Sequence, residues 1–391
     1  MSERWDVVIA GAGIHGAGIA QAAAAAGHSV LVLERTAIAA GSSSRSSKLI
    51  HGGLRYLESG QWRLVRESLR ERTLMLRLAP ELVRLQTFYI PVYRRTRRRP
   101  WQLRIGLALY AALAGLDRSA HFGTVPRSRW GELDGLELNG LETVFWYHDA
   151  QTDDALLTAA VMRSAQSLGA RLELPAELLG ATLGDAAVWV RYRSEGREQQ
   201  CQARVLVNAA GPWAGTLARC IEPAVAVPAL ELVQGTHLEL PEVLQAGVYY
   251  LESPRDGRAI FVMPWHGRTL VGTTEVHFSG EPAACTPGRH EVHYLLGVLS
   301  HYFPRWRDSR GVQVCNAFSG LRVLPGGSGH AFHRSRETLL CTDRPQRPRL
   351  LSVYGGKLTT WRAVAARALR RIAASLPVRP ALARTDRLPL R

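Results

Sequence analysis

The chain has 391 residues and a mass of 43.1 kDa, which is enough for two hydrophobic cores. No apolar run is long enough to cross a bilayer, and the first predicted strand starts close to Met1, so we expect neither a membrane-spanning helix nor a signal peptide. The formal net charge is +16, but only Lys48 and Lys357 are lysines. Such a preference for arginine raises the pI without indicating a nucleic-acid partner, and no RNA-binding motif with interleaved aromatic residues is present.

The five cysteines show none of the spacings of a metal site, so we expect no bound metal, a reducing compartment and a cytoplasmic location. The two lysines stand out because an ammonium group is compact and is not a planar fork like guanidinium. Each lysine either marks a site where a guanidinium group does not fit or has remained by chance without a specific role.

The N-terminal region predicts a strand, a turn, a helix and a second strand. A short apolar strand at 7–10 leads into GAGIHG at 11–16, an alanine-rich helix runs to Ala26, and the next strand at 29–33 ends at Glu34. This order and spacing are typical of a dinucleotide-binding unit, in which the acid accepts hydrogen bonds from the ribose hydroxyls.

The glycines of the turn have separate roles. Gly11 permits the tight turn, Gly13 lets the backbone approach a diphosphate, and Gly16 lets the helix pack on the strand. Ile14 and His15 begin the helix, whose free N–H groups and positive dipole end favour phosphate. The other glycine cluster, at 326–329, has no strand before it and no helix after it, so we expect one bound dinucleotide, either NAD or FAD.

Residues 41–58 read GSSSRSSKLIHGGLRYLE. Small hydroxyls and glycine make a backbone cradle for a diphosphate or a flavin ring, although a flexible linker has a similar composition. The apolar pair Leu49-Ile50 and the turn at 52–53 favour a packed segment. The residues of this segment that we expect to contact the cofactor are Ser43, Ser44, Ser47, Lys48, Leu49, His51, Gly52 and Gly53.

Residues 61–88 are predicted to form one amphipathic, arginine-rich helix. A basic cluster at 94–101, which includes Trp101, precedes an apolar run at 105–116 that is too short to span a bilayer. Residues 94–116 therefore either lie in a membrane interface, with arginines at the headgroups, or form an ordinary core helix with a charged lead-in.

The second half of the chain alternates between helix and strand. We predict a helix in 151–175, strands at 171–174, 187–192 and 205–208, one antiparallel sheet within 223–340, a buried strand at 350–354 and a closing helix at about 360–374. Small residues after the strand at 205–208 again allow close approach to a nucleotide, and we assign Ala210, Gly211 and Trp213 to it.

Five segments in this order resemble the FAD-dependent glycerol-3-phosphate dehydrogenase family, within the D-amino-acid-oxidase-like flavoproteins. The most specific is SSKLIHGGLRYLE at 46–58. The others are NAAGPW at 208–213, GTH at 235–237, GTT at 272–274 and GGKLTT at 355–360. The resemblance covers nearly the whole chain and implies that the dinucleotide is FAD.

The resemblance also implies an α/β fold, with a Rossmann-like FAD-binding domain and an interleaved antiparallel-sheet substrate domain. The expected boundaries are 1–78, 150–222 and 341–391 for the FAD-binding domain, and 79–149 and 223–340 for the substrate domain. Glu275 stands where the family usually has aspartate, Val323 follows Arg322 where proline is common, and the family usually continues into a C-terminal helical domain beyond the position of Arg391.

The implied reaction is oxidation of sn-glycerol 3-phosphate to dihydroxyacetone phosphate, with hydride transfer to flavin N5 and electrons passed to a quinone. By the resemblance, His237 is the base that accepts the hydroxyl proton. Arg55 and Arg322 bind the phosphate, with Arg336 as an additional candidate and Tyr56 at the pocket wall.

Lys357 begins the last turn before the closing helix, where an ammonium group beside a helix N-terminus stabilises negative charge on reduced flavin. Its neighbours Gly356, Leu358 and Thr359 are expected to contact the cofactor too. Two alternatives stay open: a related FAD-dependent oxidase of an amine, amino acid or 2-hydroxy acid that uses oxygen, and a nucleic-acid-binding flavoprotein, which only the charge suggests.

Overall fold

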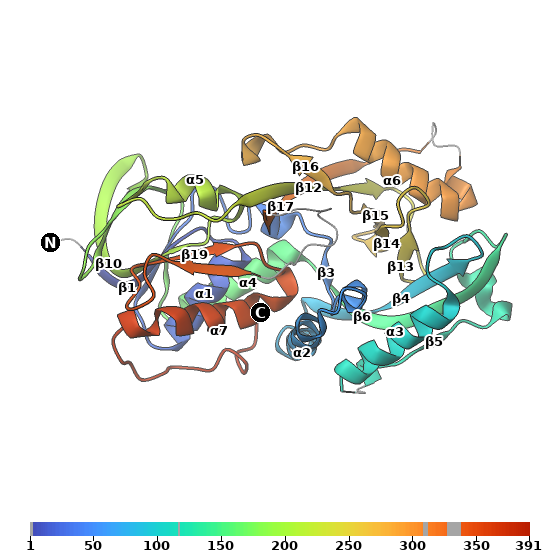
Figure 1. Ribbon diagram of the computed structural model, residues 1–391, viewed down its shortest axis with the longest axis horizontal. Coiled ribbons are helices and arrows are strands. Elements are labelled where there is room, and N and C mark those ends of the chain that lie inside the picture. The colour runs from blue at the N-terminus through green and yellow to red at the C-terminus, as the bar shows by residue number, and fades with distance from the viewer. Residues whose placement is uncertain (1–2, 116–117, 308–311, 327–337) are drawn as a thin grey trace.

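The structure is a computed structural model that describes residues 3–115, 118–307, 312–326 and 338–391. It contains two β-sheets that lie beside one another along the long axis of the molecule, each with helices packed on it (Figure 1). The N-terminal strand and the strands between residues 171 and 222 belong to one sheet, and the strands between residues 230 and 325 belong to the other. The predicted α/β class is confirmed.

The first sheet has a parallel centre, in which β1 pairs with β2 and β10, β2 with β7, and β10 with β19. Its strands are β11 (Ile221–Glu222), β8 (Ala176–Leu183), β9 (Val188–Ser194), β10 (Arg197–Asn208), β1 (Arg4–Ala10), β2 (Val30–Leu33) and β7 (Arg171–Glu173), with β19 (Leu350–Tyr354) beside β10 and β18 (Leu339–Thr342) beside β19. Val7, Val8 and Ile9 are fully buried, because a parallel sheet of this kind is covered on both faces.

Three helices form one layer on the first sheet. They are α1 (Ile14–Ala25), α4 (Asp154–Ser167) and α7 (Trp361–Ile372), and α1 packs against both of the others. The alanines of α1 are buried on nearly every side, which explains why this helix lacks an amphipathic pattern. The short helix α5 (Ala214–Ala218) follows β10.

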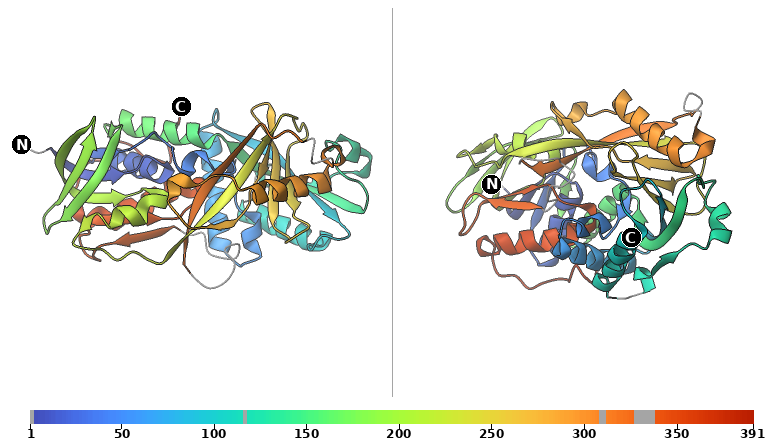
Figure 2. Two further views of the ribbon diagram at one scale, coloured as in Figure 1. Left: turned by 90° about the horizontal axis from the view of Figure 1, so that it is seen from above. Right: turned by 45° about the vertical axis from the view of Figure 1, so that its right-hand side comes forward.

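The second sheet is antiparallel except where β13 lies parallel to β4. Its strands are β16 (Val276–Phe278), β12 (Leu230–Leu240), β15 (Arg268–Gly272), β14 (Ala259–Trp265), β13 (Val248–Glu252), β4 (Val83–Tyr93), β6 (Leu141–Thr152) and β3 (Leu49–Ile50), with β17 (Asn316–Pro325) along β12 and β5 (Phe122–Thr124) along β6. Helix α6 (Arg289–Tyr302) contributes to one core of this sheet, whereas α2 (Trp62–Leu78) and α3 (Pro100–Leu113) contribute to another. Figure 2 shows the same arrangement from two further directions.

Three sequence predictions differ from the structure. The helix predicted over 61–88 ends at Leu78 and is followed by β4, because Pro80 disfavours helical backbone at Ala79. Helix α6 lies within the region predicted to be only strands. The two-residue strand β3 pairs with β6 in the second sheet, although it lies within the segment assigned to the FAD-binding domain.

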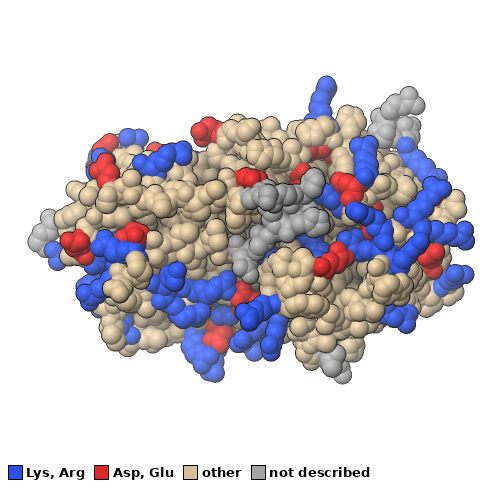
Figure 3. All heavy atoms as spheres, viewed as in Figure 1, with Lys and Arg blue, Asp and Glu red and all other residues tan. Residues whose placement is uncertain are grey.

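Helix α3 agrees with parts of both sequence interpretations of 94–116. Leu107, Tyr110 and Ala111 are buried, whereas Trp101 and Ile105 are 63% and 58% exposed. Arginines gather on the side of the molecule where β4, β13 and α3 lie (Figure 3). Within the described ranges, every helix is too short or too polar to cross a membrane.

A buried ion pair joins α2 to β6. Arg72 and Asp149 are almost fully buried, and Arg72 Nη1 lies 2.8 Å from Asp149 Oδ1. The carboxylate also accepts hydrogen bonds from the Tyr110 hydroxyl at 2.7 Å and from the Gly52 N–H at 3.3 Å. One carboxylate therefore ties α2, α3, β6 and the segment after β3 together.

We predict that Arg72→Ala lowers the free energy of unfolding by about 3–5 kcal/mol, because it leaves Asp149 as an uncompensated buried charge. Denaturant unfolding followed by circular dichroism measures this. Arg129→Ala is the matched control, since Arg129 pairs with Glu132 at 2.8 Å on the surface and such pairs contribute little. Equal losses in the two variants would contradict the interpretation of the Arg72 pair.

Candidate active site

A cavity of about 710 Å³ lies between the two sheets, within the usual range for small-molecule and cofactor sites. It is lined at one end by Glu34 and Trp213, near the first sheet, and at the other by Tyr250 and Phe261 of the second sheet. The cavity therefore joins the predicted nucleotide site to the predicted substrate site.

The glycine turn has the geometry that its sequence predicts. Gly11 has φ +101°, and a Cβ there would lie 2.8 Å from the carbonyl oxygen of Ala209. A Cβ at Gly16 would lie 1.9 Å from the carbonyl oxygen of Gly11. Gly16 does not line the cavity, so its place in the motif comes from helix packing rather than from contact with a ligand.

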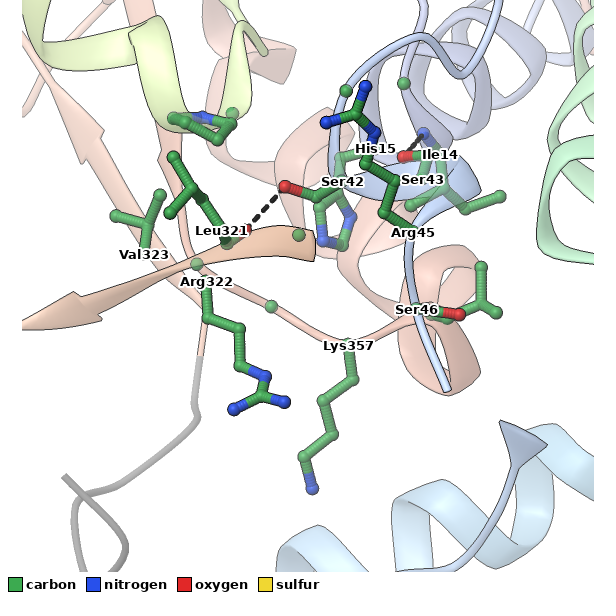
Figure 4. A pocket seen from close by; sticks show the side chains of 18 of the residues that line it. Ile14, His15, Ser42, Ser43, Arg45, Ser46, Leu321, Arg322, Val323 and Lys357 are labelled. Carbon is green, nitrogen blue, oxygen red and sulfur yellow. Dashed lines mark hydrogen bonds between the residues drawn. The ribbon is translucent and has the colours of Figure 1, made fainter. Parts of the chain in front are cut away.

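The start of α1 and the end of β2 form a cradle for a dinucleotide. The Ile14 N–H donates to Ser43 Oγ at 2.9 Å, as Figure 4 shows, and Gly13 lies beside the same hydroxyl. The Glu34 carboxylate accepts from the N–H groups of Ala12 and Thr36, both at 2.8 Å. A carboxylate has about four acceptor sites, so Glu34 keeps capacity for ribose hydroxyls. The N–H groups at the start of α1 and the carboxylate of Glu34 therefore fit a bound dinucleotide.

His15 lines the cavity between the glycine turn and Gly356. Burial and, to a smaller extent, the charge of Arg367 lower the pKa of His15 to about 4, although a hydrogen bond with the backbone of Gly355 opposes the shift. The imidazole is therefore neutral at neutral pH in this structure.

Residues 41–47 form a packed segment against β17 rather than a free linker. Ser42 Oγ donates to the carbonyl of Leu321 at 2.5 Å (Figure 4), and Arg45 Nη1 donates to the carbonyl of Ser319 at 3.3 Å. The Ser46 N–H donates to Asp154 Oδ2 at 2.9 Å, which fixes the segment to the first turn of α4.

Lys48 does not line the cavity. Its ammonium group is buried, lies 2.6 Å from Asp154 Oδ1 and donates to the carbonyl of Ser44 at 2.6 Å. Ser44 and Gly52 also lie behind the cavity wall. The structure thus places Lys48, Ser44 and Gly52 in the support of the site, in contrast to the contacts with cofactor expected from the sequence. The residues predicted to contact the cofactor that do line the cavity are Gly11, Gly13, Ile14, His15, Glu34, Ser43, Ser47, Leu49, His51, Gly53, Ala210, Gly211, Trp213, Gly356, Lys357, Leu358 and Thr359. The predicted substrate-site residues that line it are Arg55, Tyr56, His237 and Arg322.

Arg322 on β17 lies within a network of polar side chains. Its Nη1 lies 3.0 Å from Glu275 Oε1, and its Nη2 donates to Thr273 Oγ1 at 3.1 Å. Glu275 also pairs with Arg258 at 3.2 Å. A Cβ at Gly235 would lie 2.6 Å from Arg322 Nη2, so the glycine of the GTH motif leaves room for the guanidinium.

Arg55, Tyr56 and Lys357 form a second cationic group on the cavity wall. Arg55 Nη2 donates to the Tyr56 hydroxyl at 3.2 Å, and the Lys357 ammonium lies 3.7 Å from the centre of the Tyr56 ring. Burial lowers the pKa of Arg55, but Tyr56, Glu275 and Tyr250 raise it overall, so the group stays charged. Arg322 and Lys357 extend in the same direction in Figure 4.

His237 on β12 is only 1% exposed. Its Nε2 lies 3.0 Å from Ser47 Oγ, and its ring stacks on Phe318 with centroids 5.0 Å apart. Burial, the charge of Arg322 and the charge of Lys48 together lower the pKa of His237 well below 6.5, so the imidazole is neutral. A Cβ at Gly272 would lie 2.1 Å from His237 Cδ2, which explains the glycine of the GTT motif.

Sequence reasoning did not assign Arg258, Thr273 or Glu275 to the site. The sequence pointed to two of these residues. Thr273 lies in the GTT motif, and Glu275, which follows that motif, replaces the aspartate that is usual in the family. Arg258 gave no signal in a chain this rich in arginine. Arg336, predicted as an additional phosphate ligand, lies outside the described residues.

Known proteins with similar sequences are FAD-dependent oxidoreductases or dehydrogenases of phosphorylated polyols. The profile of the family "FAD dependent oxidoreductase" matches residues 6–362. The aerobic glycerol-3-phosphate dehydrogenase of Escherichia coli K12 is 35% identical over 95% of this chain and 74% of that protein. The D-erythritol 1-phosphate dehydrogenase of Brucella abortus is 34% identical over the same shares.

Solved structures show the same fold. A glycerol-3-phosphate dehydrogenase from Bacillus halodurans, complexed with FAD, has a TM-score of 0.76 and 24% identity over 99% of this chain and 68% of that chain. A glycine oxidase from Geobacillus kaustophilus has a TM-score of 0.74 and 20% identity over 95% of each chain.

The lowered pKa of His15 predicts a pH dependence of stability. Unfolded His15 binds a proton below about pH 6.5, whereas folded His15 does so only near pH 4, so the free energy of unfolding falls as the pH drops through this window. The slope from this residue is at most about 1.4 kcal/mol per pH unit. We predict that His15→Asn makes thermal stability less dependent on pH between 7 and 4.5.

Thermal unfolding at fixed FAD concentration, compared between wild type and variant, measures this difference. His293→Asn on the exposed face of α6 is the matched control for losing a histidine. An unchanged acid sensitivity in His15→Asn would show that His15 titrates normally.

Proposed function

Because this chain belongs to the FAD dependent oxidoreductase family, we propose that it oxidises the secondary alcohol of a polyol phosphate, with sn-glycerol 3-phosphate as substrate and dihydroxyacetone phosphate as product. Its cofactor is FAD. The observation that carries the proposed substrate is the set of cations at one end of the cavity: Arg55, Arg322 and Lys357 all line it. A phosphate dianion matches several convergent cations, whereas the zwitterionic substrate of an amino-acid oxidase does not.

The arginines suit phosphate for a further reason. Arg322 and Arg258 share the carboxylate of Glu275, and the charge of Glu275 reaches Arg55 as well. This shared carboxylate holds the guanidinium groups in place and offsets part of their mutual repulsion, so the site is organised before an anion enters it. Such preorganisation lowers the cost of binding.

His237 serves as the base in this proposal. FAD, when bound, accepts the hydride of the carbinol carbon, so the protein must accept the hydroxyl proton. A neutral imidazole accepts a proton, and His237 is neutral because its pKa lies well below 6.5. Lys357 directly precedes the turn before α7, and its ammonium lies on the cavity wall over the Tyr56 ring. With FAD bound, this positive charge would stabilise negative charge on the reduced cofactor.

A second candidate substrate has a specific basis. The D-erythritol 1-phosphate dehydrogenase of Brucella abortus matches this chain as well as the glycerol-3-phosphate dehydrogenases do. Both substrates carry one phosphate and a secondary alcohol, so the same cations and base serve either one. Comparing the two as reductants of the bound flavin distinguishes them.

We propose a quinone as the electron acceptor, reached at the inner face of the cell membrane through α3. Trp101 and Ile105 present an apolar face to solvent, and exposed arginines such as Arg95, Arg99 and Arg104 surround it. An interfacial helix has this composition, with aromatic and aliphatic side chains in the headgroup boundary and arginines at the headgroups.

The phosphate site predicts the behaviour of Arg322→Ala. Losing a charged hydrogen bond to the substrate weakens binding by about 1.5–3 kcal/mol, roughly a tenfold to hundredfold rise in the concentration of glycerol 3-phosphate that half-bleaches the flavin. Anaerobic visible spectra of the holoenzyme measure this concentration. Arg268→Ala on β15, whose guanidinium pairs with Glu239 at 2.9 Å and does not line the cavity, is the matched control.

Glycerol at equal concentration tests whether the phosphate is needed. Equal bleaching by glycerol and by glycerol 3-phosphate would exclude the proposed phosphate site. A holoenzyme that neither polyol phosphate bleaches would exclude the proposed function.

The exposed face of α3 predicts binding to anionic vesicles at low salt, since each basic residue near the surface contributes about 1 kcal/mol. We expect the double variant Trp101→Ser, Ile105→Ser to float with vesicles much less than wild type. Leu382→Ser is the matched control, because Leu382 is 63% exposed on the C-terminal segment. Reversing Arg98 would be a poor test, since it pairs with Glu58 and Glu252. Wild-type protein that stays below the vesicles would refute the membrane proposal.

A further inference from the structure

We infer that Ser47 carries the proton from the substrate hydroxyl to His237, so that the base acts through a serine rather than directly. This inference rests on the proposed function, because the relay serves the oxidation of an alcohol. It assigns Ser47 a role in proton transfer in addition to its place in the cavity wall.

The imidazole of His237 forms part of the cavity wall but is almost completely covered by its neighbours. It is 1% exposed, stacks on Phe318 at an interplanar angle of 15°, and packs closely against Gly272 on β15. Its Nδ1 hydrogen-bonds none of the described residues. The Ser47 hydroxyl, 3.0 Å from Nε2, is therefore the polar group of the described site that touches the ring, and Ser47 itself lines the cavity at intermediate exposure.

The backbone on both sides of Ser47 is held by α4 and β6. The Ser46 N–H and the Lys48 ammonium both bind the Asp154 carboxylate, and the Lys48 N–H donates to Ser46 Oγ at 3.1 Å. The carbonyl of Lys48 accepts from the Thr152 N–H at 2.9 Å. A hydroxyl on so constrained a segment keeps its distance to His237, as a relay requires.

The charges around His237 couple the relay to substrate binding. Arg322 and Lys48 face the imidazole and disfavour its protonation, while their partners Glu275 and Asp154 offset part of each charge. An anionic substrate beside Arg322 offsets more of that charge and favours the imidazolium. The base therefore becomes stronger once the phosphorylated substrate is bound.

The proposed step conserves protons and electrons. The O–H bond of the substrate breaks and its proton passes to Ser47 Oγ, while the proton of Ser47 passes to His237 Nε2. The hydrogen of the carbinol C–H bond leaves with the electron pair of that bond as hydride, and its acceptor is FAD, the cofactor of this family. The alcohol becomes a ketone, the imidazole becomes an imidazolium ion and the serine is regenerated.

The test compares Ser47→Ala with Ser47→Thr, which keeps the hydroxyl. Anaerobic stopped-flow measures flavin bleaching by saturating glycerol 3-phosphate, expressed per bound flavin, across a range of pH. We expect the wild-type rate to fall at acid pH as His237 becomes protonated. We expect Ser47→Ala to bleach at least tenfold more slowly, to lack this acid limb, and to keep the substrate concentration for half-bleaching within threefold of the wild-type value. Ser47→Thr should restore most of the rate and the acid limb.

A double-variant cycle with His237→Gln supplies an independent readout. If Ser47 and His237 act in one relay, Ser47→Ala with His237→Gln bleaches no more slowly than His237→Gln alone. If the rate losses of the two single variants multiply in the double variant, the relay is wrong. A Ser47→Ala enzyme with the wild-type bleaching rate and pH profile per bound flavin would also overturn it. Failure of wild type itself to bleach would refute the proposed function instead, so the two failures are distinguishable.

Discussion

The buried ion pair between Lys48 and Asp154 fixes the segment on which the site depends. This segment leaves the first sheet, passes the cavity and enters the second sheet as β3. Asp154, at the start of α4, holds Lys48 and the N–H of Ser46, and Asp149 on β6 holds the N–H of Gly52 together with Arg72. Removing one partner of such a pair leaves an unpaired buried charge, which is far more costly than the pair itself. These buried contacts thus fix the position of the cavity wall.

Several motif glycines in this protein are explained by neighbouring side chains rather than by turns. The glycine at 235 leaves room for the guanidinium of Arg322, and the glycine at 272 leaves room for the imidazole of His237. Both lie in strands of the second sheet, where glycine weakens a strand unless close packing requires it. The GTH and GTT motifs therefore shape the wall that carries His237, the proposed base, and Arg322, a proposed phosphate ligand.

Charge is distributed differently inside the cavity and outside it. The surface is arginine-rich because of composition, and most of its ion pairs are exposed and contribute little. Inside, Glu275 is shared by Arg322 and Arg258, and His237 is kept neutral by burial beside cations. An anion that enters the cavity meets cations held by carboxylates and a neutral imidazole, which is the arrangement that the proposed oxidation of a phosphorylated alcohol needs.

The sequence by itself determined the local units. The glycine turn, the helix after it and Glu34 form a dinucleotide site because hydrogen bonding, helix dipole and steric space act over a few residues. It also assigned Ser43, His15 and Trp213 to the cofactor site, and the family resemblance assigned His237 and Arg322 to the substrate site and FAD as the cofactor. The predicted end of α2 was wrong because a proline ends this helix early. Helix α6 was missed because its sequence pattern did not separate helix from strand.

Only the tertiary structure decided which long-range partners each side chain meets. Lys48 looked like a ligand-binding lysine in the sequence, but α4 brings Asp154 to it from 106 residues away and makes it a support of the wall. Ser47 meets His237 across 190 residues, and Glu275 joins Arg258 to Arg322. Such contacts depend on how elements distant in the sequence pack together, which the type and local spacing of these residues do not specify.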